Sequence, residues 1–288
     1  MLFSEIIGQD AIKKDLLEAS AMNRVAHAYM LYGPEGSGKL PLALAFAQYL
    51  NCEHPTGTDS CGECDSCRAF AKLEHPDLHF VFPIVKDKEK DKLCCDDYLT
   101  EWRELFRQNP YISLEWWQAH IGVENKQPII YESEAAGDKD QPRIKGIIKK
   151  LSISNFSAKY KIMVIWMAEK MNDVCANKIL KILEEPTPNT IFFLIVEDSR
   201  YMLPTILSRT QIVRIPKIDD ESLSKRIHDD FMLDGLELQS LVKNANGNYI
   251  QAFKSATSNN TPSQYFDLFT RMMRAAWQRD VFALNTMV

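Results

Sequence analysis

A glycine-rich heptapeptide, residues 33–39 (GPEGSGK), restricts most strongly what this chain can fold into. The apolar run 28–32 (AYMLY) comes directly before it, and helical periodicity over 42–50 follows. A strand, a glycine-rich turn and a helix in this order form a phosphate-binding loop, because glycines let backbone amides converge at the helix N-terminus and a lysine adds positive charge. The candidate phosphate-binding residues are Gly33, Gly36, Gly38 and Lys39.

The residues after the lysine depart from a hydrolytic site. An ATP-hydrolysing loop places Ser or Thr next, whose hydroxyl holds Mg²⁺. Here Leu40 follows, and then Pro41, which has no N–H to offer a phosphate. We therefore expect ATP or ADP to bind weakly or not at all.

A second strand contributes an acidic residue to an ATP-hydrolysing site, and this chain also lacks that acid. The best candidate for a buried strand in the C-terminal half is 161–166 (KIMVIW). A hydrolytic site normally has an acid at the end of this strand, for Mg²⁺ and the attacking water. Trp166 and Met167 stand there, and the first acid is Glu169. Unless the strand is misplaced by a few residues, this chain alone is not expected to hydrolyse ATP.

Four of the seven cysteines are grouped in the pattern C-x8-C-x2-C-x2-C. Four thiolates complete the tetrahedral coordination of zinc and leave no open position, so the expected ion is structural. The predicted ligands are Cys52, Cys61, Cys64 and Cys67. His54 and His75 are alternative ligands, and a redox cluster is the other interpretation.

Charge and hydropathy exclude several classes. The chain has 34 Lys+Arg against 39 Asp+Glu, a net charge of −5, which is unlike a free-standing DNA-binding protein. The longest apolar run, 191–196, is too short to cross a bilayer. Glu5 and Asp10 interrupt any signal-peptide core. We expect a cytoplasmic protein without membrane contact.

Several segments, in order and spacing, resemble delta prime subunits of the bacterial DNA polymerase III clamp loader, in the AAA+ superfamily. The likeness covers most of residues 1–215. Besides the phosphate loop and the cysteine cluster, the segments are 27–29 (HAY), 75–77 (HPD), 176–186 (ANKILKILEEP) and 203–210 (LPTILSRT).

The resemblance implies a function in trans. In this family the arginine of a Ser-Arg-Cys segment reaches ATP bound by a neighbouring subunit. Arg209 is the residue carried over, with Ser208 helping to fix the turn and Thr210 in place of cysteine. A guanidinium suits this task because it is permanently charged and planar. The alternative is a surface arginine near the negative end of a helix.

Two further departures favour a subunit that does not hydrolyse ATP over the gamma and tau motor subunits. Glu197 stands where active members hold a polar sensor on the fourth strand, and Ile250 stands in place of a second sensor arginine. The implied partners are gamma/tau and delta subunits, the sliding clamp and, mainly through the complex, primed DNA. The chain would then be part of a DNA-directed DNA polymerase holoenzyme.

The expected fold class is α/β. It comprises an AAA+ phosphate-loop parallel sheet with an inserted zinc knuckle, a small helical lid domain and the start of a helical collar. The expected boundaries are 1–215 for the ATPase-like domain, with the knuckle at 52–67 and an insertion at about 86–140, then 216–258 for the lid and 259–288 for a truncated collar. Tryptophans of the insertion are expected in a core or interface, although a platform for single-stranded DNA is an alternative.

Two other functions stay open. An active clamp-loader-type ATPase could use Glu169 or a displaced acid, and would bind nucleotide with magnesium dependence. A zinc-stabilised DNA-binding module would bind DNA tightly and with strong salt dependence. The basic segment 143–150 is a candidate phosphate-facing patch, or an ordinary solvated helix face.

Overall fold

The structure is a computed structural model that describes residues 1–85, 94–123, 158–257, 270, 272–274 and 276–277. The charge run 86–92, the basic segment 143–150 and most of the expected collar, 259–288, lie outside the described residues.

In the residues that the structure describes, one or more helices separate successive strands as far as Arg214, and the elements after Arg214 are helices. The strands are β1 (Ala28–Tyr32), β2 (Leu78–Val81), β3 (Lys161–Trp166), β4 (Thr190–Val196) and β5 (Gln211–Arg214). The longer helices of the sheet domain are α1 (Asp10–Ala21), α2 (Lys39–Leu50), α3 (Asp65–Ala71), α4 (Leu99–Gln108), α5 (Leu114–Ile121) and α7 (Asp173–Glu184). The short helices are η1 (Phe3–Glu5), η2 (Cys95–Tyr98), η3 (Ala168–Lys170), η4 (Ser199–Tyr201) and α8 (Pro204–Leu207). The lid is α9 (Asp220–Phe231), α10 (Gly235–Ala245) and α11 (Tyr249–Thr257).

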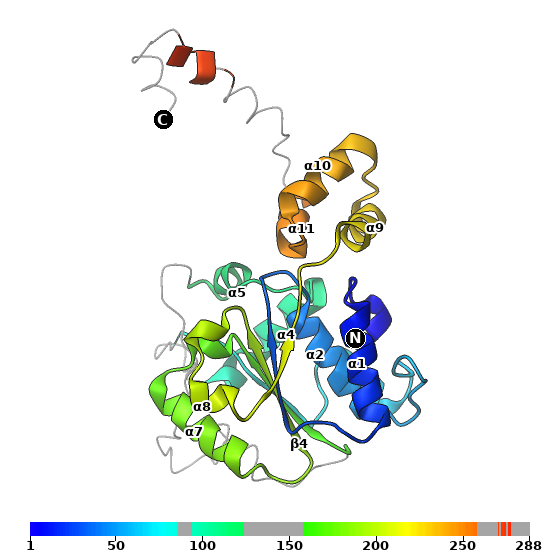
Figure 1. The fold of residues 1–288 in the computed structure, drawn as a ribbon, viewed down its shortest axis with the longest axis vertical. Helices are drawn as coiled ribbons and strands as arrows, with labels where there is room; N and C mark the ends of the chain where they lie inside the picture. The colour runs from blue at the N-terminus through cyan, green and yellow to red at the C-terminus, as the bar shows by residue number, and fades with distance from the viewer. Residues whose placement is uncertain (86–93, 124–157, 258–269, 271, 275, 278–288) are drawn as a thin grey trace.

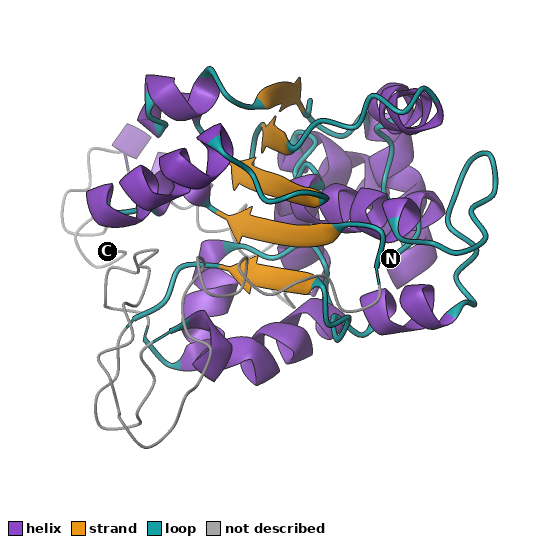
Figure 2. Cartoon of the chain, turned by 90° about the horizontal axis from the view of Figure 1, so that it is seen from below, coloured by secondary structure: helices purple, strands orange, loops and turns teal. Residues whose placement is uncertain are grey.

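The five strands form one parallel sheet in the order β2-β3-β4-β1-β5. Strands β1 and β3 have the bounds that the sequence predicts. Every residue of β3 and β4 is buried, which agrees with their continuous apolar sequences, because a parallel sheet is covered on both faces. Figure 1 shows α1 and α2 on one side of the sheet and α7 and α8 on the other, and Figure 2 shows the strands enclosed by helices.

Helix α2 is buried nearly all round. It contacts strands β1, β3 and β4 as well as helices α1 and α3, and its sequence is apolar on every face. The phosphate loop leads into its N-terminus, and the cysteine-rich segment starts just after its C-terminus. Both candidate ligand sites are therefore fixed to one central helix.

The described part of the expected insertion, residues 94–123, is joined to the sheet by aromatic side chains. Trp102 and Trp117 are 0% exposed, and the Trp102 ring stacks on Phe82 at 4.5 Å and contacts Trp166 at 5.2 Å. The Trp117 indole N–H donates to the Pro83 carbonyl at 2.7 Å. These two tryptophans are core residues, so they are not available to stack on DNA bases.

The lid has its own apolar cluster, which includes Leu223, Ile227, Val242 and Ile250. It lies beyond one end of the sheet in Figure 1. Among the described helices, none is long and apolar enough to cross a membrane.

Candidate functional site

The phosphate loop has the geometry that its glycines predict. Residues 33–38 connect β1 to α2, at the carboxyl edge of the sheet where open parallel sheets bind ligands. Gly36 and Gly38 have φ angles of 69° and 88°, in the left-handed region that favours glycine, and Gly38 is the N-cap of α2. Both glycines line the cleft next to the loop.

The Lys39 side chain is hydrogen-bonded within the phosphate loop. It is only 6% exposed, and its ammonium group donates to the Gly33 carbonyl at 2.8 Å and the Pro34 carbonyl at 2.6 Å. Burial lowers the pKa of Lys39 to about 8, although Glu197, Glu169 and Glu35 act in the opposite direction. The one cation of the loop is thus already hydrogen-bonded to carbonyls of the same loop.

The residues directly after Lys39 and at the end of β3 supply no hydroxyl or carboxylate for Mg²⁺. Leu40 is 4% exposed and packs in the core. Trp166 and Met167 stand at the end of β3, as predicted, and both line the cleft. These apolar side chains occupy the positions from which an active site would contact Mg²⁺.

Three acids, Glu35, Glu169 and Glu197, lie in this region, and among the described residues they do not form a group that could hold a metal ion. Glu197 follows β4 and lines the cleft, whereas Glu169 is not among the lining residues. One carboxylate oxygen of Glu169 accepts from the Glu197 N–H at 3.1 Å, and the other is buried without a partner among the described residues. Burial raises the pKa of the Glu169 and Glu197 carboxyl groups, which favours their uncharged forms.

The cleft next to the loop is nearly filled. Its cavity volume is about 30 Å³, whereas sites for small ligands occupy roughly 300 Å³ or more. The space is taken by Pro110, Tyr111, Ile112 and Ile250. Sequence reasoning missed Pro110, Tyr111 and Ile112, because nothing in the segment between α4 and α5 indicates that it reaches the phosphate loop.

Arg209 lies just after α8, away from this cleft. Its guanidinium donates to the Thr205 carbonyl at 2.9 Å and forms an ion pair with Glu184 at 2.8 Å. The Ser208 hydroxyl donates to the same carbonyl at 3.0 Å and accepts from Arg209 at 3.3 Å. The Arg209 side chain is 34% exposed and is not among the residues that line the cleft. Arg209 is therefore held at the surface. Its pairing with Glu184, the first glutamate of the Leu-Glu-Glu-Pro segment, was not foreseen.

The four predicted cysteine ligands come together. Their sulfur atoms all lie within 4.8 Å of one another, and the Cys61 sulfur is 3.5 Å from that of Cys52 and 3.8 Å from that of Cys67. A tetrahedral Zn²⁺ with Zn–S bonds of about 2.3 Å sets sulfurs about 3.8 Å apart. The four side chains therefore fit a zinc ion.

Backbone amides orient these sulfurs. The Cys61, Cys64 and Cys67 amides donate to the sulfurs of Cys52, Cys61 and Cys64 respectively. Hydrogen bonds from backbone amides also lower the pKa of Cys61 to about 6. His75 does not belong to the cluster: its Nδ1 accepts from the Asp77 amide, and its ring packs on Phe70 at 4.6 Å.

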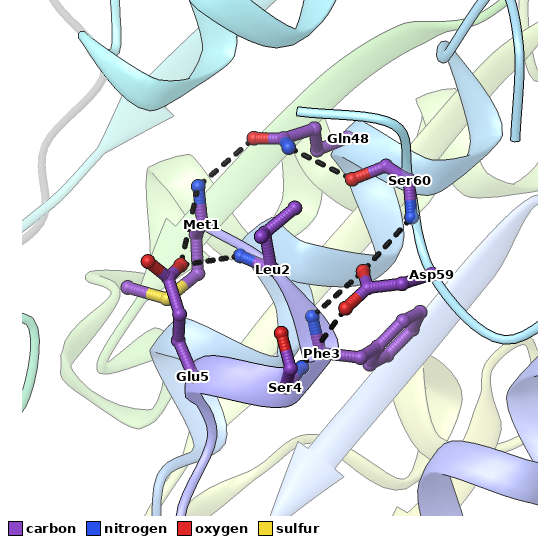
Figure 3. A network of polar contacts seen from close by, with 8 residues as sticks. All are labelled: Met1, Leu2, Phe3, Ser4, Glu5, Gln48, Asp59 and Ser60. Carbon is purple, nitrogen blue, oxygen red and sulfur yellow. Dashed lines mark hydrogen bonds and ion pairs between the residues drawn. The ribbon is translucent and has the colours of Figure 1, made fainter. Parts of the chain in front are cut away.

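The cysteine segment is tied to η1 and α2 by the polar network in Figure 3. The Asp59 carboxylate accepts from the amides of Phe3 and Ser4 at 2.9 and 3.0 Å. Gln48 of α2 donates to the Ser60 hydroxyl at 2.8 Å and accepts from the Met1 nitrogen at 2.9 Å. Ordering this segment therefore also orders the residues that precede α1.

The fold and the cleft define the chain as a parallel α/β protein with a phosphate-binding loop. Residues 8–219 match the sequence model of the family described as "DNA polymerase III, delta subunit". Since the match spans more than half of the chain, the chain belongs to this family.

Three curated relatives agree with this assignment. The chain is 30% identical over 184 residues to DNA polymerase III subunit delta' of Pseudomonas aeruginosa, covering 64% of this chain and 41% of the relative. It is 25% identical to subunit delta' of Bacillus subtilis, covering 76% and 51%. It is 24% identical to subunit tau of the same organism, covering 82% and 32%. The chain thus spans about a third to a half of the length of these relatives.

The similarity to solved structures is low. A DNA polymerase III gamma subunit-related protein of Thermotoga maritima has a TM-score of 0.45 and 16% identity, over 86% of this chain and 56% of its own. The RuvB Holliday junction branch migration motor of the same organism has a TM-score of 0.45 and 14% identity, over 95% and 66%. At these values the structures add nothing to the family assignment.

Proposed function

We propose that this chain is a non-hydrolysing, delta prime-type subunit of a DNA polymerase III clamp loader. In that assembly it would help to load the sliding clamp onto primed DNA, and Arg209 would reach ATP bound by a neighbouring gamma/tau subunit. Delta subunits would complete a hetero-oligomer that acts in the cytoplasm. The names of the curated relatives as DNA polymerase III subunits support these partners.

One observation carries the non-hydrolysing assignment. Next to Lys39 the chain places buried Leu40 and the apolar Trp166, where a hydrolytic site needs oxygen ligands for Mg²⁺. Lys39 is itself bonded to loop carbonyls, and the remaining cavity volume is about 30 Å³. This space is far smaller than the roughly 300 Å³ or more of a small-ligand site, so it leaves little room for a triphosphate with its metal.

Arg209 supports the second half of the proposal. Its backbone turn is fixed through Thr205 and Ser208, while a third of its side chain is exposed to solvent. The ion pair with Glu184 is half-exposed, and such pairs contribute little, about 1 kcal/mol or less. The phosphate oxygens of a neighbouring ATP could therefore replace Glu184 at small cost.

The cysteine cluster would hold a structural zinc ion, with Cys52, Cys61, Cys64 and Cys67 as ligands. All four positions of the tetrahedron are then taken by protein sulfurs, which leaves no position for a substrate. The ion would stiffen the segment that Asp59 and Ser60 attach to η1 and α2.

The experiment is a reconstitution with gamma/tau and delta subunits, the clamp and primed DNA. We expect Arg209→Ala to lower the stimulated ATP turnover by about a hundredfold or more. Arg200→Ala is the matched control, because Arg200 is an exposed arginine of η4 paired with Asp198. Lys39→Ala should leave turnover unchanged. Full turnover with Arg209→Ala would refute the role of this arginine.

An active ATPase is the second candidate, and the buried unpartnered oxygen of Glu169 is the observation in its favour. Glu169 does not line the cleft, however, and its other oxygen is used by the Glu197 amide. Magnesium-dependent turnover by the isolated chain that Lys39→Ala abolishes would favour this candidate.

A further inference from the structure

The segment between α4 and α5 crosses the cleft beside the phosphate loop. Within it, Tyr111 is 4% exposed, and its ring lies against the loop: a Cβ added to Gly38 would be 3.2 Å from both the ring and the hydroxyl of Tyr111. The Tyr111 N–H donates to the side-chain oxygen of Asn109 at 2.9 Å, and Asn109 is itself buried. The hydrogen bond to Asn109 thus fixes the backbone that carries the Tyr111 ring.

The same side chain contacts two other parts of the molecule. Its hydroxyl accepts a hydrogen bond from the buried Ile7 N–H at 3.0 Å, 104 residues away in sequence. Its ring packs against Tyr249 of the lid, with ring centroids 4.6 Å apart. Tyr111 therefore belongs to the apolar cluster of the lid, together with Ile7 and Ile250.

A nucleotide bound to this loop would have to use the same space. Its phosphates would lie on the amides at the N-terminus of α2, and the rest of the molecule would extend into the cleft that begins there. That cleft is bounded by Gly38, Tyr111 and Ile250. A nucleotide base is a flat aromatic ring with hydrogen-bond acceptors at its edge, and Tyr111 supplies both: an aromatic plane, and an oxygen that accepts from a backbone amide.

We propose that Tyr111 takes the place of a nucleotide base and holds the lid, α9–α11, on the phosphate loop without nucleotide. This inference rests on the proposed non-hydrolysing function and adds to it: the position of the lid is fixed by the chain, so it does not follow the nucleotide state. The cleft is then a cryptic site for a nucleoside diphosphate.

Contacts around Tyr111 strengthen the same junction. The Tyr249 amide donates to the Gly36 carbonyl at 3.3 Å, which joins the lid directly to the loop. From α5, Trp116 packs on Phe253 at 5.6 Å, and Glu115 forms an ion pair with Lys254. The segment that fills the cleft therefore also carries the helix that contacts the lid.

The test compares Tyr111→Ala with Tyr111→Phe in the full chain. Phenylalanine keeps the ring and loses the hydroxyl, whereas alanine removes both. Binding is measured by calorimetry with ADP in the absence of Mg²⁺, because Leu40 and Trp166 stand where a hydrolytic site has oxygen ligands for the metal. Amide hydrogen exchange is measured at Ile7 and along α11.

We expect Tyr111→Ala to bind ADP at least tenfold more tightly than the wild type, and its α11 amides to exchange at least tenfold faster until ADP is added. Tyr111→Phe should still exclude ADP, while its Ile7 amide exchanges about five to ten times faster, as loss of one hydrogen bond predicts. The gain of ADP binding should disappear in Tyr111→Ala/Lys39→Ala.

A folded Tyr111→Ala that binds ADP no better than the wild type would overturn the base-like role, and unchanged exchange in α11 would overturn the hold on the lid. If Tyr111→Ala does not fold, Tyr111→Phe decides alone: an unchanged Ile7 exchange rate refutes the proposal, and a faster rate supports it. Tight ADP binding by the wild type would instead contradict the proposed function.

Discussion

The two ends of helix α2 carry two candidate ligand sites that differ in what surrounds them. At the N-terminal end, Lys39 is bonded to loop carbonyls and Tyr111 fills the cleft. At the C-terminal end, four cysteine sulfurs converge within 4.8 Å and backbone amides orient them. Residue types indicate the ligand that a site was built for, but only the fold shows whether another segment of the chain takes that ligand's place. Four predictions test this contrast, from the largest expected effect on stability to the smallest.

Removing the metal should have the largest effect. With zinc bound, treatment with a chelator should lower the free energy of unfolding by more than about 4 kcal/mol, because the ion holds the segment that anchors η1. Cys64→Ser should show the same loss and no further response to chelator. Metal analysis and denaturant titration provide the measurements.

Cys175→Ala is the control for the metal prediction, since Cys175 is buried outside the cluster. It should keep one zinc per chain. The metal site would be refuted if the wild-type chain contains no zinc, or if the chelator does not change its free energy of unfolding.

A clash between the phosphate loop and the lid should have the second-largest effect on the free energy of unfolding. In Gly36→Ala the new Cβ would lie 1.9 Å from the Asn248 side-chain oxygen, at a φ of 69° that alanine disfavours. We expect a loss of about 3 kcal/mol in denaturant titration, from the strained backbone and the clash. Gly122→Ala is the matched control, because Gly122 has the same φ of 69° and nothing lies within 4 Å of the Cβ position there. Equal stability of the two variants would mean that the lid does not rest on the loop.

Burial of Lys39 predicts a specific pH dependence. Because its pKa falls from the ordinary 10.5 to about 8 on folding, the unfolded chain binds more protons between these values. The free energy of unfolding of the wild type should therefore rise from about pH 8 to 10.5 relative to Lys39→Met. The gain is at most roughly 3 kcal/mol, at about 1.4 kcal/mol for each pKa unit. Denaturant titrations of both proteins measure the difference, and a constant difference would place the ammonium in solvent.

A hydroxyl group restored at position 40 should have the smallest effect on the free energy of unfolding. Leu40→Thr should cost about 2 kcal/mol of stability, since a buried apolar side chain is replaced by a polar one. We expect it to leave Mg·ATP binding undetectable by calorimetry, because the cleft is still filled. Magnesium-dependent binding by this variant would show that the hydroxyl, and not Tyr111, decides whether nucleotide enters.

Local features of this molecule were predictable from its sequence. The run 28–32, the glycines of the loop and the strand 161–166 have the predicted form, because hydrophobic patterning and glycine conformation act over a few residues. The four cysteines were also predictable as a group, since C-x2-C spacing brings sulfurs together within one turn.

Contacts between distant segments were not predictable. Strand β2 is only four residues long and received no prediction, and the tryptophans near it indicated a core without placing it. Tyr111 meets Ile7 only after α4 and α5 have packed on the sheet. Likewise, Glu184 reaches Arg209 because α7 packs beside α8. Each of these contacts depends on tertiary packing that no local pattern encodes.

We infer that this chain's own phosphate loop does not serve nucleotide chemistry. The direct test is calorimetric titration of the isolated chain with Mg·ATP, paired with a measurement of phosphate release. We expect no binding heat up to about 1 mM and turnover at background. Micromolar, magnesium-dependent binding that disappears in Lys39→Ala would contradict it.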